Sequence, residues 1–101
     1  MLEDAEGGIT DTVAKEVDVP AGKMYVKVYA PFRTYFDGIA NNISAVNDTG
    51  PFDILPRHHN FMTLLNPGDV IVRADTGEKK ITITRGIMHV KADRAIVFLD
   101  V

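Results

Sequence analysis

Three histidines are the side chains of this sequence with the clearest potential for metal chemistry. His58 and His59 are adjacent, and His89 lies in a separate apolar segment. Because neighbouring side chains on an extended chain point to opposite sides, His58 and His59 are poorly placed to bind one ion. We therefore expect a structural or interface role for these histidines and no bound metal.

Catalytic groups of other kinds are scarce. The sequence contains no cysteine, and its single serine, Ser44, lies in a predicted strand without a nucleophile-elbow motif. Asp93 and Asp100 are interpreted as turn and terminus residues rather than as a pair of catalytic carboxylates. The eight glycines are dispersed among turns with no helix after them, which excludes a phosphate-binding P-loop. We expect no catalytic residue and no cofactor.

The composition is that of one soluble domain. With 101 residues, 46% of them hydrophobic and 25% charged, the chain can form a packed core without disulfides. No apolar segment approaches the ~20 residues of a membrane-spanning helix, and the acidic start is unlike a signal peptide. The sequence lacks a cluster of Lys and Arg, which argues against a nucleic-acid partner. We expect the chain to stay on the side of the membrane where it is made.

Residues 1–22 differ from the rest of the chain in charge. They contain six acids and one lysine, and they end in the turn-forming segment Pro20-Ala21-Gly22. Val13 and Val17 could share one side of a short helix, but so few apolar residues do not stabilise an isolated helix. The sequence therefore predicts a flexible acidic arm over residues 1–22 and a folded domain over residues 23–101.

Short runs of alternating polarity fill the rest of the chain. Residues 24–30 alternate up to Pro31, and residues 39–46 are predicted as a further strand after a break at Gly38. Residues 69–74 and 80–84 flank a turn and predict a hairpin. About eight to ten short strands with Gly, Pro, Asn and Asp turns between them predict an all-β fold, a two-layer β-sandwich. The predicted core comprises Val26, Val28, Ile43, Ile54, Leu64, Ile81, Ile83, Ile87 and Val97, with Met62 and Met88 as further core side chains.

A polar elbow interrupts the apolar runs between Gly50 and Gly68. Pro56 removes a backbone donor and fixes φ, and four polar side chains follow it in the segment PRHHN. Residues 47–51 (NDTGP) form a second concentrated turn signal just before this stretch. We interpret the elbow as contact surface, because such a corner exposes its polar groups without a folding cost.

Several of these segments together resemble the N-terminal β-sandwich domain of the epsilon subunit of F-type ATP synthases, called delta in mitochondria. The resemblance runs without gaps from about residue 24 to residue 101. Residues 28–38 (VYAPFRTYFDG) resemble the opening strand of the family. Residues 50–65 (GPFDILPRHHNFMTLL) resemble its central Ile-Leu-Pro and histidine motif. Residues 66–72 resemble its Lys-Pro-Gly turn and strand, and residues 86–90 (GIMHV) resemble its Gly-Gly-Ile-Leu-Glu-Val.

The resemblance implies a non-catalytic rotor subunit that links gamma to the c ring in the central stalk of a proton- or sodium-translocating ATP synthase. Such a subunit transmits torque and reaches the membrane only through its complex, at the cytoplasmic face or the mitochondrial or chloroplast equivalent. Carried over residue by residue, residues 47–53 would face the c ring and residues 56–60 would lie at the gamma contact. The partner-binding residues implied in this way are Asn47, Asp48, Pro51, Asp53, Pro56, Arg57, His58 and Asn60.

The sequence also departs from the family pattern. Asp53 stands where the family usually has a second glycine, Arg57 where it has glycine or asparagine, and Asn60 where it has proline. Arg85 and His89 replace a glycine and a glutamate. The acidic arm is an addition, and the C-terminal helical hairpin of the family has no counterpart, since the sequence stops where the sandwich would end.

Two alternatives stay open at this stage. A small cupin-like, metal-dependent enzyme is one, because PRHHN followed by PGDVIV is faintly similar to cupin metal motifs. The sequence lacks the His-x-His pair and the following glutamate that supply most of the metal ligands in that fold. The other alternative is a free-standing β-sandwich that binds some other protein.

Overall fold

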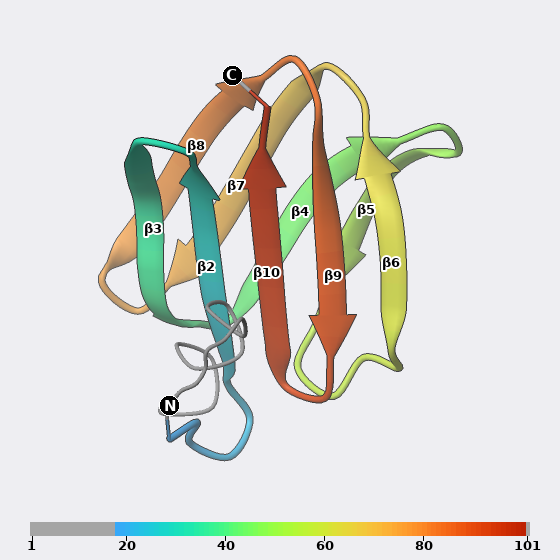
Figure 1. Ribbon diagram of the computed structural model, residues 1–101. Helices are drawn as coiled ribbons and strands as arrows, with labels where there is room; N and C mark the ends of the chain where they lie inside the picture. The colour runs from blue at the N-terminus through green and yellow to red at the C-terminus, as the bar shows by residue number, and fades with distance from the viewer. Residues whose placement is uncertain (1–17, 101) are drawn as a thin grey trace, which may run out of the picture.

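The computed structural model describes residues 18–100, and every regular element in this part of the chain is a β-strand (Figure 1). The prediction of an all-β fold with about eight to ten short strands is therefore confirmed. Most of the predicted acidic arm, residues 1–17, lies outside the described residues. The strands are β2 (Met24–Ala30), β3 (Arg33–Ala40), β4 (Asn42–Asn47), β5 (Gly50–Ile54), β6 (Phe61–Leu65), β7 (Gly68–Ala74), β8 (Gly77–Ile83), β9 (Gly86–Lys91) and β10 (Arg94–Leu99).

The strands form two layers, as predicted. One sheet has five strands in the order β3-β2-β10-β9-β6, and the other has four in the order β5-β4-β7-β8. The five-stranded sheet lies in front of the four-stranded sheet in Figure 1. Neighbouring strands are antiparallel except β10 and β2, which run parallel with Ala95 opposite Val26. Each sheet therefore has an inner face toward the other sheet and an outer face, and the outer faces are available for contacts.

The connection from β2 to β4 differs from its prediction. β2 ends before Pro31, as expected, but β3 continues through Gly38, where a break was predicted. Gly38 stays in the ladder because it pairs with Val26 of β2. The chain changes sheets at Asn41 instead, and its N–H donates to the carbonyl of Arg73 at 2.7 Å. The predicted strand over residues 39–46 is thus divided between β3 and β4.

The hairpin predicted from residues 69–84 is confirmed with a shorter turn. β7 and β8 pair along their whole length, from Gly68 opposite Ile83 to Ala74 opposite Gly77. Only Asp75 and Thr76 separate the strands. Gly77 has a φ of 134°, a value that favours glycine and explains how so short a turn closes here.

The core lies between the two sheets, and most of its predicted members are buried there. Leu64 and Ile87 are exceptions, because they are 70% and 43% exposed, and Met62 is 64% exposed. In β6 the side chain turned inward is Leu65, so the prediction for Leu64 is wrong by one residue of register. In β9 the prediction for Met88 is correct, and its neighbour Ile87 faces outward. The predicted core residues found buried are Val26, Val28, Ile43, Ile54, Ile81, Ile83, Met88 and Val97.

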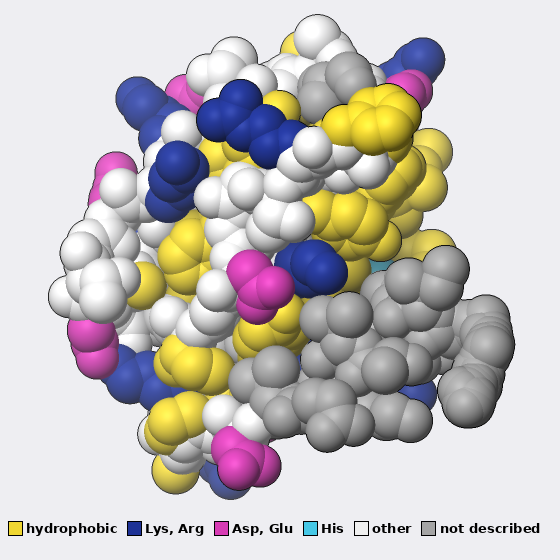
Figure 2. Space-filling model, turned by 60° about the vertical axis from the view of Figure 1, so that its left-hand side comes forward, with side chains coloured by type: hydrophobic (Ala, Val, Ile, Leu, Met, Phe, Trp, Pro, Cys, Tyr) yellow, Lys and Arg dark blue, Asp and Glu magenta, His cyan; other side chains and the backbone are white. Residues whose placement is uncertain are grey.

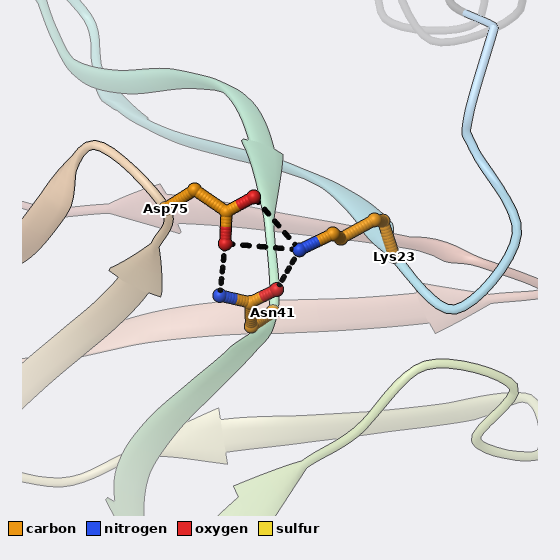
Figure 3. Close-up of polar contacts among 3 residues, drawn as sticks. All are labelled: Lys23, Asn41 and Asp75. Carbon is orange, nitrogen blue, oxygen red and sulfur yellow. Dashed lines mark hydrogen bonds and ion pairs between the residues drawn. The ribbon is translucent and has the colours of Figure 1, made fainter.

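A polar cluster joins the two sheets at one edge (Figure 3). Lys23 precedes β2, Asn41 connects β3 to β4, and Asp75 lies in the turn between β7 and β8. The Lys23 ammonium donates to both Asp75 oxygens, at 2.9 and 3.0 Å, and to the Asn41 side-chain oxygen. The Asn41 amide donates to Asp75 at 3.0 Å. These bonds, first that from Asn41 and then that from Lys23, lower the pKa of Asp75 below its ordinary value.

Candidate functional site

A row of large apolar side chains crosses the outer face of the five-stranded sheet. The strand registers place Leu64 beside Ile87, Ile87 beside Phe98, and Phe98 beside Tyr29. The rings of Tyr29 and Phe98 meet edge to face with their centroids 5.2 Å apart. Leu64, Ile87 and Phe98 are among the exposed large hydrophobic residues. We call these four residues the apolar row.

The next positions along the same strands alternate between apolar and polar side chains. Met62 lies opposite His89, and His89 lies opposite Ile96. The ammonium of Lys27 lies 5.0 Å from the centre of the Tyr29 ring, in the geometry of a cation–π contact. The side of the molecule that holds this sheet has turned to the right in Figure 2, where hydrophobic side chains reach the surface.

A groove runs along the apolar row, at one end of the outer face. Its volume is about 620 Å³, and the side chains of Leu64, Ile87 and Phe98 form its apolar wall. An ion pair between Arg85 and Asp100, 2.8 Å from Nε to Oδ2, borders it. The remaining lining residues are Leu65, Asn66, Pro67, Thr84 and Gly86. An apolar side chain of a partner can therefore enter this end of the face.

The opposite end of the same face is polar. Tyr25 lies in the outward register of β2 but is only 1% exposed, and its hydroxyl donates to Asp37 at 2.6 Å. Burial, followed by this hydrogen bond, raises the pKa of the Tyr25 phenol, so the hydroxyl stays protonated and neutral. Lys91 and Arg94 pair across β9 and β10 at this end. Asp37 lies opposite Lys27 in the register of β2 and β3, and Arg94 is paired with Asp93. The outer face thus changes from apolar to polar, with charges of both signs, along the strands.

Seven of the eight residues implied as partner contacts fall at two opposite ends of the sandwich. Asn47, Asp48 and Pro51 surround the turn between β4 and β5, and β5 then carries the chain to the other end (Figure 1). The side-chain oxygen of Asn47 accepts from the N–H of Thr49 at 2.9 Å. Asp48 is exposed and accepts from Asn66 at 2.9 Å, which holds this turn beside the groove.

Asp53 belongs to neither end. It lies within β5, on the outer face of the four-stranded sheet, where its carboxylate accepts from the hydroxyl of Ser44. A strand position with a hydrogen-bond partner in its own sheet differs from the exposed turn position that the resemblance implied. The structure therefore separates Asp53 from the turn residues that precede it.

Pro56, Arg57, His58 and Asn60 do form one corner, between β5 and β6. Arg57 is exposed and has a φ of 68°, a left-handed conformation that turns the chain sharply. The side-chain oxygen of Asn60 accepts from the N–H of Ala92 at 3.1 Å, in the turn between β9 and β10. The elbow is therefore attached to the five-stranded sheet and borders the polar end of its outer face.

The two adjacent histidines are arranged differently from the prediction. Their rings stack with centroids 4.2 Å apart, because residues 58 and 59 follow the turn at Pro56 and Arg57 and do not belong to a strand. Both rings meet Phe61 edge to face. Among residues 18–100 no group of three or more His, Asp or Glu side chains is placed to hold a metal ion.

The apolar row is the feature that the sequence interpretation missed, since it placed Leu64 and Ile87 in the core. A signal for the correct register was present in β9. His89 shares the face of Ile87, whereas Met88 and Val90 share the other face, and a histidine marks the outward side more reliably than an isoleucine does. In β6 the run Phe-Met-Thr-Leu-Leu carries no charge, so its alternation gives no such signal.

The described part of the chain contains no helix that is long and apolar enough to cross a membrane. This finding stands beside the sequence observation that no apolar segment reaches the length of a spanning helix.

Comparisons with known proteins agree with the fold and with the sequence resemblance. The family model for the ATP synthase delta/epsilon chain β-sandwich domain matches residues 23–101. The ATP synthase epsilon chain of Synechococcus sp. (strain WH7803) is 36% identical over 75 residues, which cover 74% of this chain and 55% of that protein. The epsilon chain of Ruthia magnifica is 31% identical over 77 residues, covering 76% of this chain and 56% of that protein. The chain thus spans about half the length of the curated relatives it matches.

Two solved structures share the architecture. A chain of the Euglena gracilis mitochondrial ATP synthase OSCP/F1/c-ring structure matches with a TM-score of 0.72 and 17% identity, covering 98% of this chain and 58% of that one. A chain of the Tetrahymena thermophila mitochondrial ATP synthase central stalk/c-ring structure matches with a TM-score of 0.64 and 20% identity, covering 76% and 63%. These likenesses show the fold, and the family match does not support the cupin-like alternative. The protein belongs to the family of the ATP synthase delta/epsilon chain β-sandwich domain.

Proposed function

We propose that this chain is a non-catalytic central-stalk component of an F-type ATP synthase and that it binds gamma through the outer face of its five-stranded sheet. The observation that carries the proposal is the apolar row, in which Leu64, Ile87 and Phe98 are exposed side by side. Contiguous exposed apolar side chains on a folded domain mark contact surfaces, because only burial against a partner removes them from water.

The elbow extends this surface. Arg57 and His58 lie at the border of the same outer face, because Asn60 fixes the elbow to the turn after β9. A polar border around an apolar centre is the usual anatomy of a protein interface. The gamma contact would then include the apolar row at its centre and the elbow at its edge.

The turn around Asn47 and Asp48 is proposed as the contact with the polar loops of the c ring. It projects from the end of the sandwich opposite the elbow (Figure 1), so one molecule could touch two partners at once. Such a connector transmits torque by being rigid, and it makes and breaks no bonds. Its place would be the cytoplasmic face of the membrane, or the mitochondrial or chloroplast equivalent, and it would reach the membrane only through its complex.

A matched pair of isoleucines tests the proposed gamma surface. Ile87 lies on the outer face of the five-stranded sheet, and Ile71 lies on the outer face of the four-stranded sheet beside Ser44. Ile87→Asp should weaken binding to the gamma subunit from the same cell by about 10- to 100-fold, because it places a charge at the centre of the interface. Ile71→Asp should leave the affinity unchanged. Equal affinities of the two variants, with both folded by circular dichroism, would contradict the proposal.

The elbow has a separate test in the double variant Arg57→Glu, His58→Glu. Both side chains are at the border of the face, so charge reversal should weaken gamma binding by about tenfold or less while the melting temperature is kept. Unchanged affinity would remove the elbow from the interface and leave the apolar row as the contact. Unfolding would show instead that the elbow is structural.

A further inference from the structure

The edge strands of the two sheets differ in how they are protected against pairing with another chain. β8 carries the exposed lysines Lys79 and Lys80, β5 contains Pro51, and β3 is paired to β2 through a bulge. Lysines, prolines and bulges at a sheet edge discourage the addition of a further strand. β6, the outermost strand on the right of Figure 1, has the uncharged sequence Phe-Met-Thr-Leu-Leu and a regular register with β9. Within residues 18–100 it has a strand neighbour on one side only, so its other side is an unprotected sheet edge.

Exposed apolar side chains gather on this side of the sandwich. Leu55, just after β5, is 57% exposed, and Met62 and Leu64 of β6 are 64% and 70% exposed. Between the sheets, the half-buried rings of Phe52 and Phe61 meet edge to face with their centroids 6.0 Å apart. A strand that pairs with an open edge satisfies backbone groups and also removes such apolar surface from water. The β6 edge therefore offers both kinds of contact to an incoming strand.

The sequence of β6 fits a second copy of itself. In antiparallel pairing about a two-fold axis at Thr63, this residue lies opposite Thr63 of the second copy, and Met62 lies opposite Leu64. Met62 and Leu64 share the outer face, so their apolar side chains meet there in both halves of the pair. On the inner side, Phe61 lies opposite Leu65 in the same register. Self-pairing of β6 therefore places no apolar side chain opposite a charged one.

The same antiparallel arrangement brings opposite charges together at each end of the pair. The elbow with Arg57 precedes β6, whereas Asp48 lies beside the other end of β6, where it accepts from Asn66 at 2.9 Å. Antiparallel pairing therefore places Arg57 of each copy toward Asp48 of the other. Both side chains are exposed, and among residues 18–100 neither forms an ion pair. Charge complementarity thus favours a second copy as the partner of this edge.

We propose that two copies of this chain associate through their β6 edges, which joins their five-stranded sheets into one continuous sheet. The contact is small, since each copy contributes a strand of five residues and the apolar side chains beside it. Small interfaces give weak and reversible association, here with a dissociation constant on the order of 10–1,000 µM. The pairing does not depend on the proposed function. Its consequence does: Leu64 belongs both to this edge and to the apolar row, so pairing and gamma binding compete.

Analytical ultracentrifugation of the full chain tests the association. The average mass should rise from that of a monomer at about 1 µM toward that of a dimer at about 1 mM. Met62→Lys places a charge on the β6 edge and should keep the protein monomeric over this range. Thr82→Lys is the matched control, because it changes an exposed residue on β8, the edge strand of the other sheet, and should leave the association unchanged. A parent protein that stays monomeric, or equal losses in the two folded variants, would overturn the proposal.

Disulfide formation tests the register, because the sequence contains no cysteine. Met62→Cys and Leu64→Cys place their sulfur atoms directly opposite each other in the proposed pair, whereas two copies of the same variant place them on a longer diagonal. Oxidation of an equal mixture of the two variants should therefore give the mixed disulfide in clear excess over the about one half that random pairing gives. Mass spectrometry distinguishes the products, and a mixed product at or below one half would contradict pairing about Thr63.

Exchange of the two charges tests the complementarity at the ends of the pair. Arg57→Asp and Asp48→Arg should each weaken the association by about three- to tenfold, because like charges then meet at both ends. The double variant with both changes should recover the affinity of the parent to within about twofold. A double variant as weak as the single ones would contradict the antiparallel arrangement.

Addition of gamma separates this proposal from the proposed function. The gamma subunit from the same cell should convert the paired chains into complexes with one copy per gamma, because both contacts require Leu64. A complex that holds two paired copies on one gamma would refute the competition while the pairing itself stands. Absence of any gamma binding would refute the proposed function, and the sedimentation without gamma would still decide on the pairing.

Discussion

The two outer faces of the sandwich obey the same alternation of inward and outward side chains but present opposite surfaces. On the four-stranded sheet the outward side chains bind one another. Arg73 donates to the side chains of Asn42 at 2.9 Å and Ser44 at 2.7 Å, and its guanidinium lies 3.5 Å from Glu78. On the five-stranded sheet the corresponding positions carry Leu64, Ile87 and Phe98. The polar groups on the four-stranded sheet are hydrogen-bonded to one another. The five-stranded sheet instead exposes apolar side chains, which leave water only when a partner covers them.

This difference teaches where a sandwich of this kind can bind. A partner on the four-stranded sheet would have to compete with an existing hydrogen-bond network, and each displaced bond would need a replacement. A partner on the five-stranded sheet displaces only water from apolar carbon, which lowers the free energy by roughly 25 cal/mol for each Å² buried. In the proposed function, this asymmetry rather than the fold directs the association to one side.

The largest expected effect distinguishes the inner from the outer side of β6. Leu65 is 2% exposed and Leu64 is 70% exposed, although they are neighbours of the same type. Leu65→Ala should lower the free energy of unfolding by about 2–5 kcal/mol, because it opens a cavity in the core. Leu64→Ala should cost less than about 0.5 kcal/mol. Urea unfolding measures both values, and a reversed order would place the apolar row in the core.

The fold was predictable because its strands have clear alternating patterns and are separated by turn-forming residues. Met24 to Ala30 alternates cleanly, Pro31 stops it, and the hairpin of β7 and β8 has a turn of favourable residues. Gly38 was misleading, since a glycine in a strand resembles a break when its ladder partner, Val26, is unknown. Local pattern therefore specified the type of each element better than its bounds.

The candidate site was harder to predict for a physical reason. A strand such as β6, with apolar residues on both sides, has no inherent inward side, so only its pairing with β9 decides between Leu64 and Leu65. The elbow was found because Pro56 and its polar neighbours are unfavourable in a core. A contact surface made of polar turns can be predicted from sequence. A surface made of apolar side chains has the same pattern as a core, and only the pairing of the strands distinguishes the two.

The second largest effect on the free energy of unfolding is expected at Gly86, which lines the groove. A Cβ at this position would lie 2.7 Å from the backbone oxygen of Phe98 and 3.0 Å from Leu99 Cδ2. Gly86→Ala should therefore move β9 away from β10 and lower the free energy of unfolding by about 1–3 kcal/mol. Gly50→Ala is the contrasting variant, because open space surrounds that glycine and only its φ of 112° opposes the change. Chemical denaturation compares the two, and a Gly86→Ala protein as stable as the parent would show that the strands can separate without cost.

A smaller effect tests the network on the polar outer face. Arg73→Met removes the donor to Asn42 and Ser44 and should lower the free energy of unfolding by about 1 kcal/mol. Arg85→Met removes the exposed ion pair with Asp100 beside the groove. This variant should lower the free energy of unfolding by close to zero. Equal losses would mean that the network adds nothing beyond a surface ion pair, and the contrast between the two faces would then rest on the apolar row alone.

The smallest effect is the pH dependence of the cluster that joins the sheets. The hydrogen bonds from Asn41 and Lys23 hold the pKa of Asp75 below its ordinary value of 3.8, so the folded protein favours the carboxylate more than the unfolded chain does. The resulting stability is present above that ordinary value and is lost as the pH falls through the lowered pKa of the folded state. Asp75→Asn cannot titrate, so the difference in melting temperature between parent and variant should shrink as the pH is lowered from about 6 to about 2.

Exposure limits the size of that pH effect. The side chain of Asp75 is 75% exposed, and water screens its contacts with Lys23. Asp48→Asn is the control, since it removes an exposed carboxylate at the turn between β4 and β5 and measures the general effect of one lost charge. Melting curves that run parallel for the parent and Asp75→Asn across the whole pH range would show that the cluster is only a contact of side chains. If the melting temperatures of the parent and Asp75→Asn converge at low pH, while those of Asp48→Asn stay parallel to the parent, the cluster couples the two sheets through the charge of Asp75.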